Sequence, residues 1–124
     1  MLKKVAFACT TLLLIYLPFV AQDAAKAGAM SEIVESCAWT WRRTSDGSIV
    51  ASNVRFLSNK QIVGYSSKNE RSWDIQNGEF VFRGQSGEVL TIFDKAGFRQ
   101  GKLILAGHYV GGDRTVTELT CDGF

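Results

Sequence analysis

The sequence predicts an all-β fold, a small antiparallel barrel or sandwich of seven to eight short strands closed by one disulfide. Apolar residues recur at every second position through most of residues 28–124, which is the period of a half-buried strand. All 12 glycines lie in this part of the chain, and the only proline, Pro18, precedes it. Two cysteines, Cys37 and Cys121, lie near its two ends. Residues 28–124 are long enough for a single secreted domain and too short for two.

Residues 1–27 have the pattern of a signal peptide. Two lysines precede an apolar run over residues 5–20, and the small residues Ala25 and Ala27 stand at the two positions that a signal peptidase reads. We expect cleavage near Ala27, and an earlier cut near Ala21 fits the same pattern. The alternative is an uncleaved anchor, but the apolar run is shorter than the roughly 20 residues that a membrane-spanning helix needs. The prediction is an exported protein, periplasmic or extracellular, without membrane contact after leader removal.

Export determines how the cysteines are interpreted. Cys9 leaves with the leader, and Cys37 and Cys121 then fold in a compartment where disulfides form and persist. A bridge between them closes most of the domain into one loop, for which chain entropy gives at most about 4 to 5 kcal/mol of stabilisation. Two cysteines and one distant histidine are too few for a metal site, and a reactive thiol needs a nearby base that the sequence does not place. We therefore expect a disulfide, no metal and no cofactor.

The charge of the predicted domain argues against nucleic acid as a partner. Of the 14 Lys and Arg residues three lie in the leader, and of the 12 Asp and Glu residues one does, so the domain holds 11 of each and is formally neutral. Basic and acidic residues are interleaved, apart from Arg42-Arg43, which has the character of a solvated strand end. A basic footprint for nucleic acid is absent from this pattern.

Turn residues separate the expected strands. In chain order the sequence predicts strands around Trp39 and Trp41, over residues 49–57 and 62–65, around Trp73 and Ile75, around Phe80 and Phe82, and over residues 89–93, 103–109 and 115–121. The turns between them contain Asp46-Gly47, residues 58–60, Asn77-Gly78, residues 84–87, a loop with Gly97 and Gly101, and residues 111–113. Only residues 31–36 indicate a helix, of one or two turns, with Ser31 as its cap.

Asn77-Gly78 is the strongest local signal, because a two-residue type I′ hairpin turn needs positive φ angles at both positions. Residues 89–93 are apolar on both faces, which is typical of a buried strand. A flat open sheet of these strands would leave long reactive edges, so we expect closure, and we favour an up-and-down barrel over a sandwich. In a barrel the strands that carry Cys37 and Cys121 become neighbours, which suits the disulfide.

A polar and aromatic cluster just before the Asn77-Gly78 turn is the candidate ligand-binding site. Its members are Tyr65, Asn69, Glu70, Arg71 and Trp73. Sugar rings pack their C–H patches on aromatic faces while amide, carboxylate and guanidinium groups bind their hydroxyls. Trp73 is in phase with Ile75, however, so its indole is as well suited to the core, with Asn69 or Glu70 accepting its N–H.

Catalysis is not expected. His108 is the only histidine, it lies in a predicted strand, and no G-x-S-x-G nucleophile elbow is present. Carboxylate pairs such as Glu70 with Asp74, or Glu70 with Asp113, leave glycosidase-type chemistry open, because the sequence does not fix their separation. The expectation is a non-enzymatic protein.

The segment of residues 59–82 has the pattern N-x-x-I-x-G-Y-x-x-x-N-E-x-x-W-x-I-x-N-G-x-x-x-F, followed by G-x-x-x-T-x-F over residues 87–93. This pattern resembles small β-rich modules of bacterial polysaccharide-related and glycosyltransferase-linked proteins, over about a third of the predicted domain. The resemblance implies a function connected with glycans.

Three functions remain open on these grounds. The first is an exported glycan-binding module, or one for another polar ligand of the cell envelope. The second is a small disulfide-closed protein that binds or inhibits another protein of the envelope through its loops. The third is a lipocalin-like carrier of a small apolar ligand, although Phe56, Phe80, Phe82 and Phe93 are expected to fill so small a barrel.

Overall fold

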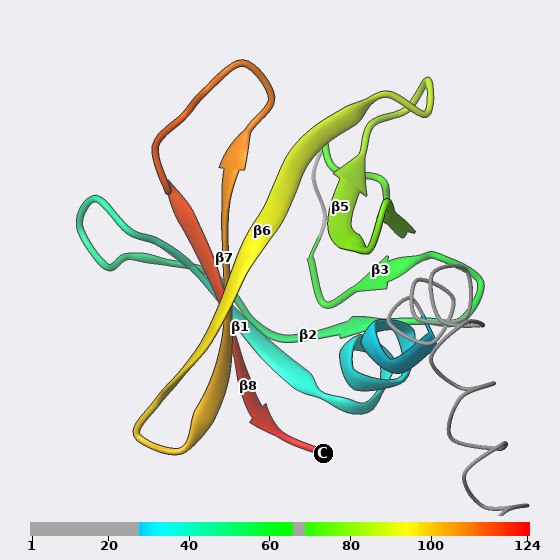
Figure 1. Cartoon of the computed structure of the whole chain (residues 1–124). Helices are drawn as coiled ribbons and strands as arrows, with labels where there is room; N and C mark the ends of the chain where they lie inside the picture. Colours follow the sequence, from blue (N-terminus) through cyan, green and yellow to red (C-terminus); the bar gives the residue numbers. More distant parts are fainter. Residues whose placement is uncertain (1–27, 66–68) are drawn as a thin grey trace, which may run out of the picture.

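The computed structural model describes residues 28–65 and 69–124, in which eight antiparallel strands curl into a nearly closed barrel (Figure 1). The strands are β1 (Ala38–Arg43), β2 (Ile49–Phe56), β3 (Ile62–Val63), β4 (Ser72–Gln76), β5 (Glu79–Arg83), β6 (Val89–Arg99), β7 (Lys102–Tyr109) and β8 (Thr117–Gly123). A helix over residues 28–36 precedes β1. The predicted all-β class is confirmed, and of the two expected architectures the barrel is the one observed.

The barrel closes between its first and last strands. The strand order is β3-β2-β1-β8-β7-β6-β5-β4, and β1 pairs with β8 from Ala38 opposite Gly123 to Arg43 opposite Thr117. The expectation that these strands are neighbours is therefore confirmed. The remaining opening lies between β3 and β4, and we call this opening the seam.

Short-range contacts bridge part of the seam. Gln61 and Ser72 form a single antiparallel bridge, and the backbone N–H of Trp73 donates to the carbonyl of Lys60 at 3.0 Å. Gly64, with a φ of 85°, turns the chain after β3 so closely over β2 that an added Cβ would lie 2.6 Å from the carbonyl oxygen of Asn53. Only glycine fits both this conformation and this approach.

Aromatic side chains fill the interior of the barrel. Phe80 is fully buried, and its ring centroid lies 4.9 Å from that of Phe56, 5.4 Å from that of Phe82 and 5.4 Å from that of Phe93. Three tryptophans are buried with them, namely Trp39, Trp41 and Trp73. The phenylalanines thus occupy the core as the sequence predicts, and large rings packed edge to face take the place of a lumen.

The hairpin turns follow from residues that adopt positive φ angles. Asn77 and Gly78, at φ 54° and 79°, join β4 to β5, as expected for a type I′ turn. Gln100 and Gly101, at φ 54° and 77°, join β6 to β7 in the same way. The expected loop around Gly97 is wrong, because β6 continues to Arg99. Residues 94–99 are exposed on both faces, so this part of the strand lacks the apolar alternation that would reveal it.

A bulge interrupts the alternation of β2. Asn53 has a φ of 55°, and the partners of Trp39 and Trp41 on β2 are Val54 and Ala51, so β2 carries one extra residue at this point. Val54 and Phe56 are buried as expected. The bulge places Ala51, rather than a polar residue, opposite Trp41.

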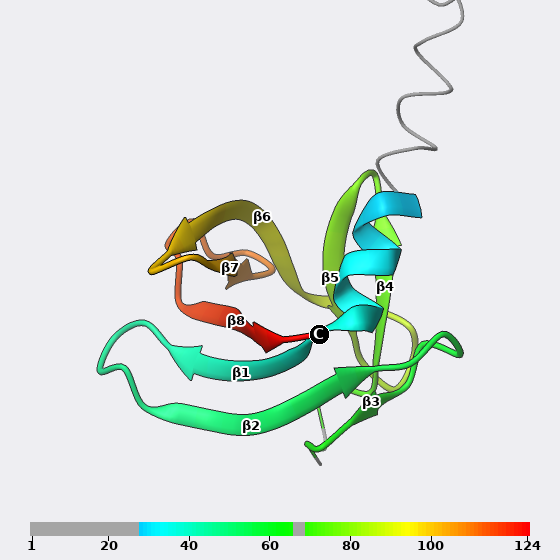
Figure 2. The same ribbon diagram turned by 90° about the horizontal axis from the view of Figure 1, so that it is seen from below.

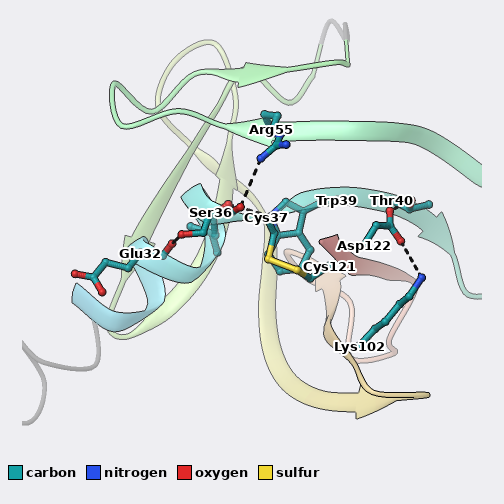
Figure 3. Close-up of a disulfide and its surroundings, with 10 residues drawn as sticks. Glu32, Ser36, Cys37, Trp39, Thr40, Arg55, Lys102, Cys121 and Asp122 are labelled. Carbon is teal, nitrogen blue, oxygen red and sulfur yellow. Dashed lines mark hydrogen bonds and ion pairs between the residues drawn. A yellow bond between two sulfur atoms is a disulfide. The ribbon is translucent and has the colours of Figure 1, made fainter. Parts of the chain in front are cut away.

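The disulfide joins Cys37, just before β1, to Cys121 in β8, with Cα atoms 5.5 Å apart (Figure 3). Both cysteines are buried, and the adjacent Trp39 donates its indole N–H to the carbonyl of Val34 at 2.9 Å, which ties the helix to the barrel. The predicted bridge is confirmed. The predicted cap at Ser31 is wrong, because residues 28–30 are already helical and Ser31 lies inside the helix.

Candidate functional site

A cleft of about 480 Å³ opens at one rim of the barrel, and we call it the rim cleft. Its lining consists of Asn69, Glu70, Val89, Leu90, Tyr109 and Val110. Two of the five predicted site residues, Asn69 and Glu70, thus line a real concavity. Its volume lies within the range of about 300 to 1,000 Å³ typical of small-molecule sites.

Three segments position the walls of the rim cleft. Asn69 and Glu70 precede β4, and the backbone N–H of the next residue, Arg71, donates to the carbonyl of Arg83 at 2.8 Å. The other wall is formed where β6 begins and β7 ends, and there the N–H of Val110 donates to the carbonyl of Leu90 at 3.0 Å. Backbone hydrogen bonds to the sheet therefore hold both walls in place.

Tyr109 gives the rim cleft its aromatic surface. It shares the inward-facing parity of the buried Leu105 and Gly107 on β7, but it is the last residue of the strand and lies at the end of the barrel. The side chain is 46% exposed, and that of the neighbouring Val110 is 56% exposed. An aromatic ring and an apolar side chain thus face solvent beside an amide and a carboxylate.

Tyr65 lies behind this polar wall. Its hydroxyl donates to Oε2 of Glu70 at 3.5 Å, and its ring packs edge-on against the buried Trp41 with centroids 4.6 Å apart. Tyr65 is half-buried and packs against the core. It is therefore placed to orient the Glu70 carboxylate rather than to present a free ring face.

Trp73 is not available to a ligand, and its inclusion among the candidate ligand-binding residues is wrong. It is 1% exposed, it stacks on Phe80, and its indole N–H donates to the carbonyl of Leu57 at 2.9 Å. The acceptor is therefore neither Asn69 nor Glu70. Trp39 and Trp41 are buried as well, so no tryptophan forms a sugar platform. Arg71 is exposed beside the rim cleft but does not line it.

The sequence did not single out Tyr109 for binding. The available signal was its position, because an aromatic residue of inward parity directly before Val110 and a Gly-Gly turn stands at the rim of a barrel. Its neighbours in the cleft, Val89 and Leu90, come from a strand about 20 residues earlier in the chain. Only the β6–β7 register, with Thr91 opposite Tyr109, brings them together.

Of the carboxylates that the sequence left open for glycosidase-type chemistry, Glu70 lines the rim cleft and its two possible partners do not. Asp74, on β4, forms ion pairs with Arg83 at 3.3 Å and with Lys60 at 3.7 Å. Neither Asp74 nor Asp113 lines the rim cleft. Nδ1 of His108 lies 3.6 Å from Oδ2 of Asp94, outside its lining. Within residues 28–65 and 69–124 no three His, Cys, Asp or Glu side chains are placed to hold a metal ion.

Two side chains outside the rim cleft have shifted pKa values. The backbone N–H of Ser48 donates to the Asp46 carboxylate at 2.9 Å and lowers its pKa. Hydrogen bonds from Arg99 to the carboxylate of Glu118, at 3.1 and 3.2 Å, raise the pKa of Arg99. The first contact lies within the turn between β1 and β2, and the second joins β6 to β8, so neither shift belongs to the rim cleft.

Comparison of the chain with protein family models, curated proteins and solved structures gives no match. In the part of the chain that the structure describes, no helix has the length and apolar character needed to cross a membrane.

Proposed function

We propose that this protein is an exported, non-catalytic module that binds a saccharide, or another ligand rich in hydroxyl groups, in the rim cleft. The observation that carries this proposal is the exposed ring of Tyr109 beside the side chains of Asn69 and Glu70. The resemblance of residues 59–93 to polysaccharide-related modules supports the same class of ligand.

The chemistry of the rim cleft suits the two faces of a sugar. The ring of Tyr109 and the side chains of Val110 and Leu90 offer an apolar surface for the C–H groups of a pyranose. The amide of Asn69 both donates and accepts, and the carboxylate of Glu70 accepts, which suits hydroxyl groups that do both. The hydroxyl of Tyr65 holds the Glu70 carboxylate toward this wall. A fixed acceptor loses less conformational entropy on binding.

Export is part of the proposal. The features of residues 1–27 are those of a leader, and the Cys37–Cys121 bridge is compatible with an oxidising compartment. Such a module would meet envelope or extracellular glycans rather than cytosolic metabolites.

A specific feature favours protein binding as a second candidate. Phe98 and Phe124 are 78% and 88% exposed, and both border a pocket of about 210 Å³ beside the β6–β7 hairpin. Exposed aromatic residues next to a small pocket are typical anchors of protein interfaces. The third candidate, an apolar carrier, is disfavoured because aromatic side chains occupy the barrel interior.

The test is a titration of the ¹⁵N-labelled protein, purified after expression of the full chain, with soluble neutral and acidic oligosaccharides. We expect one class to shift the amide signals of Leu90 and Val110 saturably. Tyr109→Ala and Glu70→Gln should each weaken that affinity about tenfold, the loss of one stacking or charge-assisted contact. Phe98→Ala removes a more exposed aromatic side chain that lies outside the rim cleft, and it should leave the affinity unchanged.

The opposite pattern distinguishes the two candidates. If no saccharide shifts these signals and a stoichiometric protein co-purifies in a manner abolished by Phe98→Ala, the protein-binding function replaces the glycan-binding one. Shifts that persist unchanged in Tyr109→Ala would place a saccharide site elsewhere and contradict the role of the rim cleft.

A further inference from the structure

A second concavity, which we call the cationic groove, lies on the outer face of the sheet and shares no lining residue with the rim cleft. Its volume is about 480 Å³. Its charged lining consists of Arg42, Arg43, Arg99, Lys102, Glu118 and Asp122. The sequence predicts Arg42-Arg43 only as a solvated strand end, and the structure places both residues in the lining of a groove.

The topology places the positive charges on two opposing walls. Arg42 and Arg43 end β1 at its hairpin with β2, while Arg99 and Lys102 are paired in the hairpin of β6 and β7. The strand between them, β8, supplies the carboxylate of Glu118, opposite Arg42. Figures 1 and 2 show both hairpins projecting on the same side of the molecule, and β8 lies between β1 and β7 in the strand order.

The groove carries an excess of positive charge in a domain that is neutral as a whole. Four cationic side chains and two carboxylates line it. Residues 28–124 hold equal numbers of basic and acidic residues, so this excess is local. A concave surface concentrates such a field and favours anions over cations.

The ion pairs in the groove neutralise its carboxylates and leave two guanidinium groups available. Arg99 binds Glu118 through both terminal nitrogens, and Nζ of Lys102 lies 3.6 Å from Oδ1 of Asp122 (Figure 3). Arg42 and Arg43 form no ion pair within the described residues, although the charge of Arg43 contributes to lowering the pKa of Asp46. Each makes one long hydrogen bond of 3.5 Å, to the carbonyl of Gly47 and to the hydroxyl of Ser48 respectively.

We propose that the cationic groove is a second binding site, for a ligand that carries two or more carboxylate or phosphate groups. The guanidinium groups of Arg42 and Arg43 are planar forks that match either anion with paired hydrogen bonds. Arg99 and Lys102 form the opposite wall, where Glu118 and Asp122 balance their charge, so the excess of positive charge lies with Arg42 and Arg43. Two guanidinium groups outside ion pairs favour a ligand with more than one anionic group over a simple monovalent ion.

The test uses three probes on the ¹⁵N-labelled protein purified after expression of the full chain: tripolyphosphate, tetragalacturonate and the uncharged maltotetraose. We expect at least one anionic probe to shift the amide signals of Lys102 and Thr120 saturably, while maltotetraose leaves them in place. Binding by tripolyphosphate alone assigns a phosphate ligand, and binding by tetragalacturonate alone assigns a carboxylate ligand.

Two double variants with the same change of charge distinguish binding in the groove from a general effect of the protein's net charge. Arg42→Gln with Arg43→Gln should weaken the anionic probe about tenfold or more, as expected for the loss of charge-assisted hydrogen bonds. Arg55→Gln with Arg114→Gln removes two positive charges outside the groove and should change the affinity less than twofold. Equal weakening in both double variants, or no shift at Lys102 and Thr120 with either anion, would overturn the proposal.

Discussion

The indole N–H of Trp73 donates to the carbonyl of Leu57 at 2.9 Å, across the seam of the barrel. Leu57 directly follows β2, and Trp73 lies in β4, so one side chain ties together the two parts of the sheet that the strand order leaves apart. Nζ of Lys60 lies 4.2 Å from the centre of the same ring and covers it on the solvent side. A buried tryptophan thus supplements the few backbone contacts that cross the seam.

Trp73→Phe should destabilise the protein by about 2 to 3 kcal/mol, because it leaves the Leu57 carbonyl without its donor and a gap beside Phe80. Urea unfolding followed by circular dichroism measures the change. Lys60→Met keeps the alkyl stem over the ring and removes the ammonium, so its cost should stay below about 1 kcal/mol. If both variants cost the same, the hydrogen bond across the seam is not the main contribution of Trp73.

Two buried threonines should respond in opposite directions to the loss of their hydroxyl groups. Oγ1 of Thr91 is buried and has no hydrogen-bond partner within residues 28–65 and 69–124. Thr91→Val should therefore stabilise the protein by about 1 kcal/mol, because it removes a buried polar group that lacks a partner.

Thr117 provides the matched control for Thr91. Its hydroxyl accepts the indole N–H of Trp41 and donates to the carbonyl of Arg42 at 3.1 Å. Thr117→Val should destabilise by about 1 to 3 kcal/mol, since both partners lose their bond while the side chain keeps its volume. Calorimetric melting of the two variants gives the signs, and destabilisation by Thr91→Val would show that its hydroxyl has a partner after all.

Much of the barrel follows from local sequence signals. Asn77-Gly78 can adopt the two positive φ angles of a type I′ turn with little strain, so β4, β5 and their register could be predicted. The core phenylalanines follow from alternation, because Phe80 and Phe82 stand two residues apart on one strand. The disulfide follows from the count of cysteines once the leader that we propose is set aside.

Other features could not be predicted in the same way, either because the residue type does not signal the conformation or because the feature depends on contacts between distant segments. The turn at Gln100-Gly101 uses a glutamine at φ 54°, a conformation that its side chain does not signal. The bulge at Asn53 depends on the pairing of β1 with β2. Trp73 cannot contact a ligand, because its indole is buried and donates to the carbonyl of Leu57. Tyr109 also has the parity of the inward-facing residues of its strand, but it lies at the end of that strand and its side chain is exposed at the rim.

Gly64→Ala should destabilise the protein by about 2 to 3 kcal/mol. Gly64 has a φ of 85°, and the added Cβ would lie 2.6 Å from the carbonyl oxygen of Asn53, so strain and a clash with backbone combine. The neighbouring Tyr65 should shift with it, which the signals of its ring would report. Gly97→Ala is the control, because its Cβ meets nothing within 4 Å, and it should be neutral or stabilising by up to about 1 kcal/mol. Equal costs for the two variants would contradict the close approach at Gly64.

Replacing Cys37 and Cys121 together by serine should lower the free energy of unfolding by about 3 to 5 kcal/mol, because the bridge joins the two ends of the domain and restricts the unfolded chain. Denaturant unfolding of the variant, and of the unaltered protein with a reducing agent, should give the same midpoint. Cys9→Ser should leave the stability unchanged, since we propose that Cys9 is removed with the leader. A loss of stability in Cys9→Ser would contradict that processing.

Two substitutions at Tyr109 separate the role of its ring from that of its hydroxyl. If the exposed ring stacks on a saccharide, Tyr109→Phe should keep the affinity within about threefold of the unaltered protein, while Tyr109→Ala should lose about tenfold. Neither should change the free energy of unfolding by more than about 1 kcal/mol, because the side chain is 46% exposed and lies outside the core cluster. Isothermal titration with the saccharide that shifts Val110, together with urea unfolding, measures both quantities. Equal losses in the two variants would assign the contact to the hydroxyl, and the rim cleft would then bind its ligand by hydrogen bonds from Tyr109, Asn69 and Glu70 without a stacking surface.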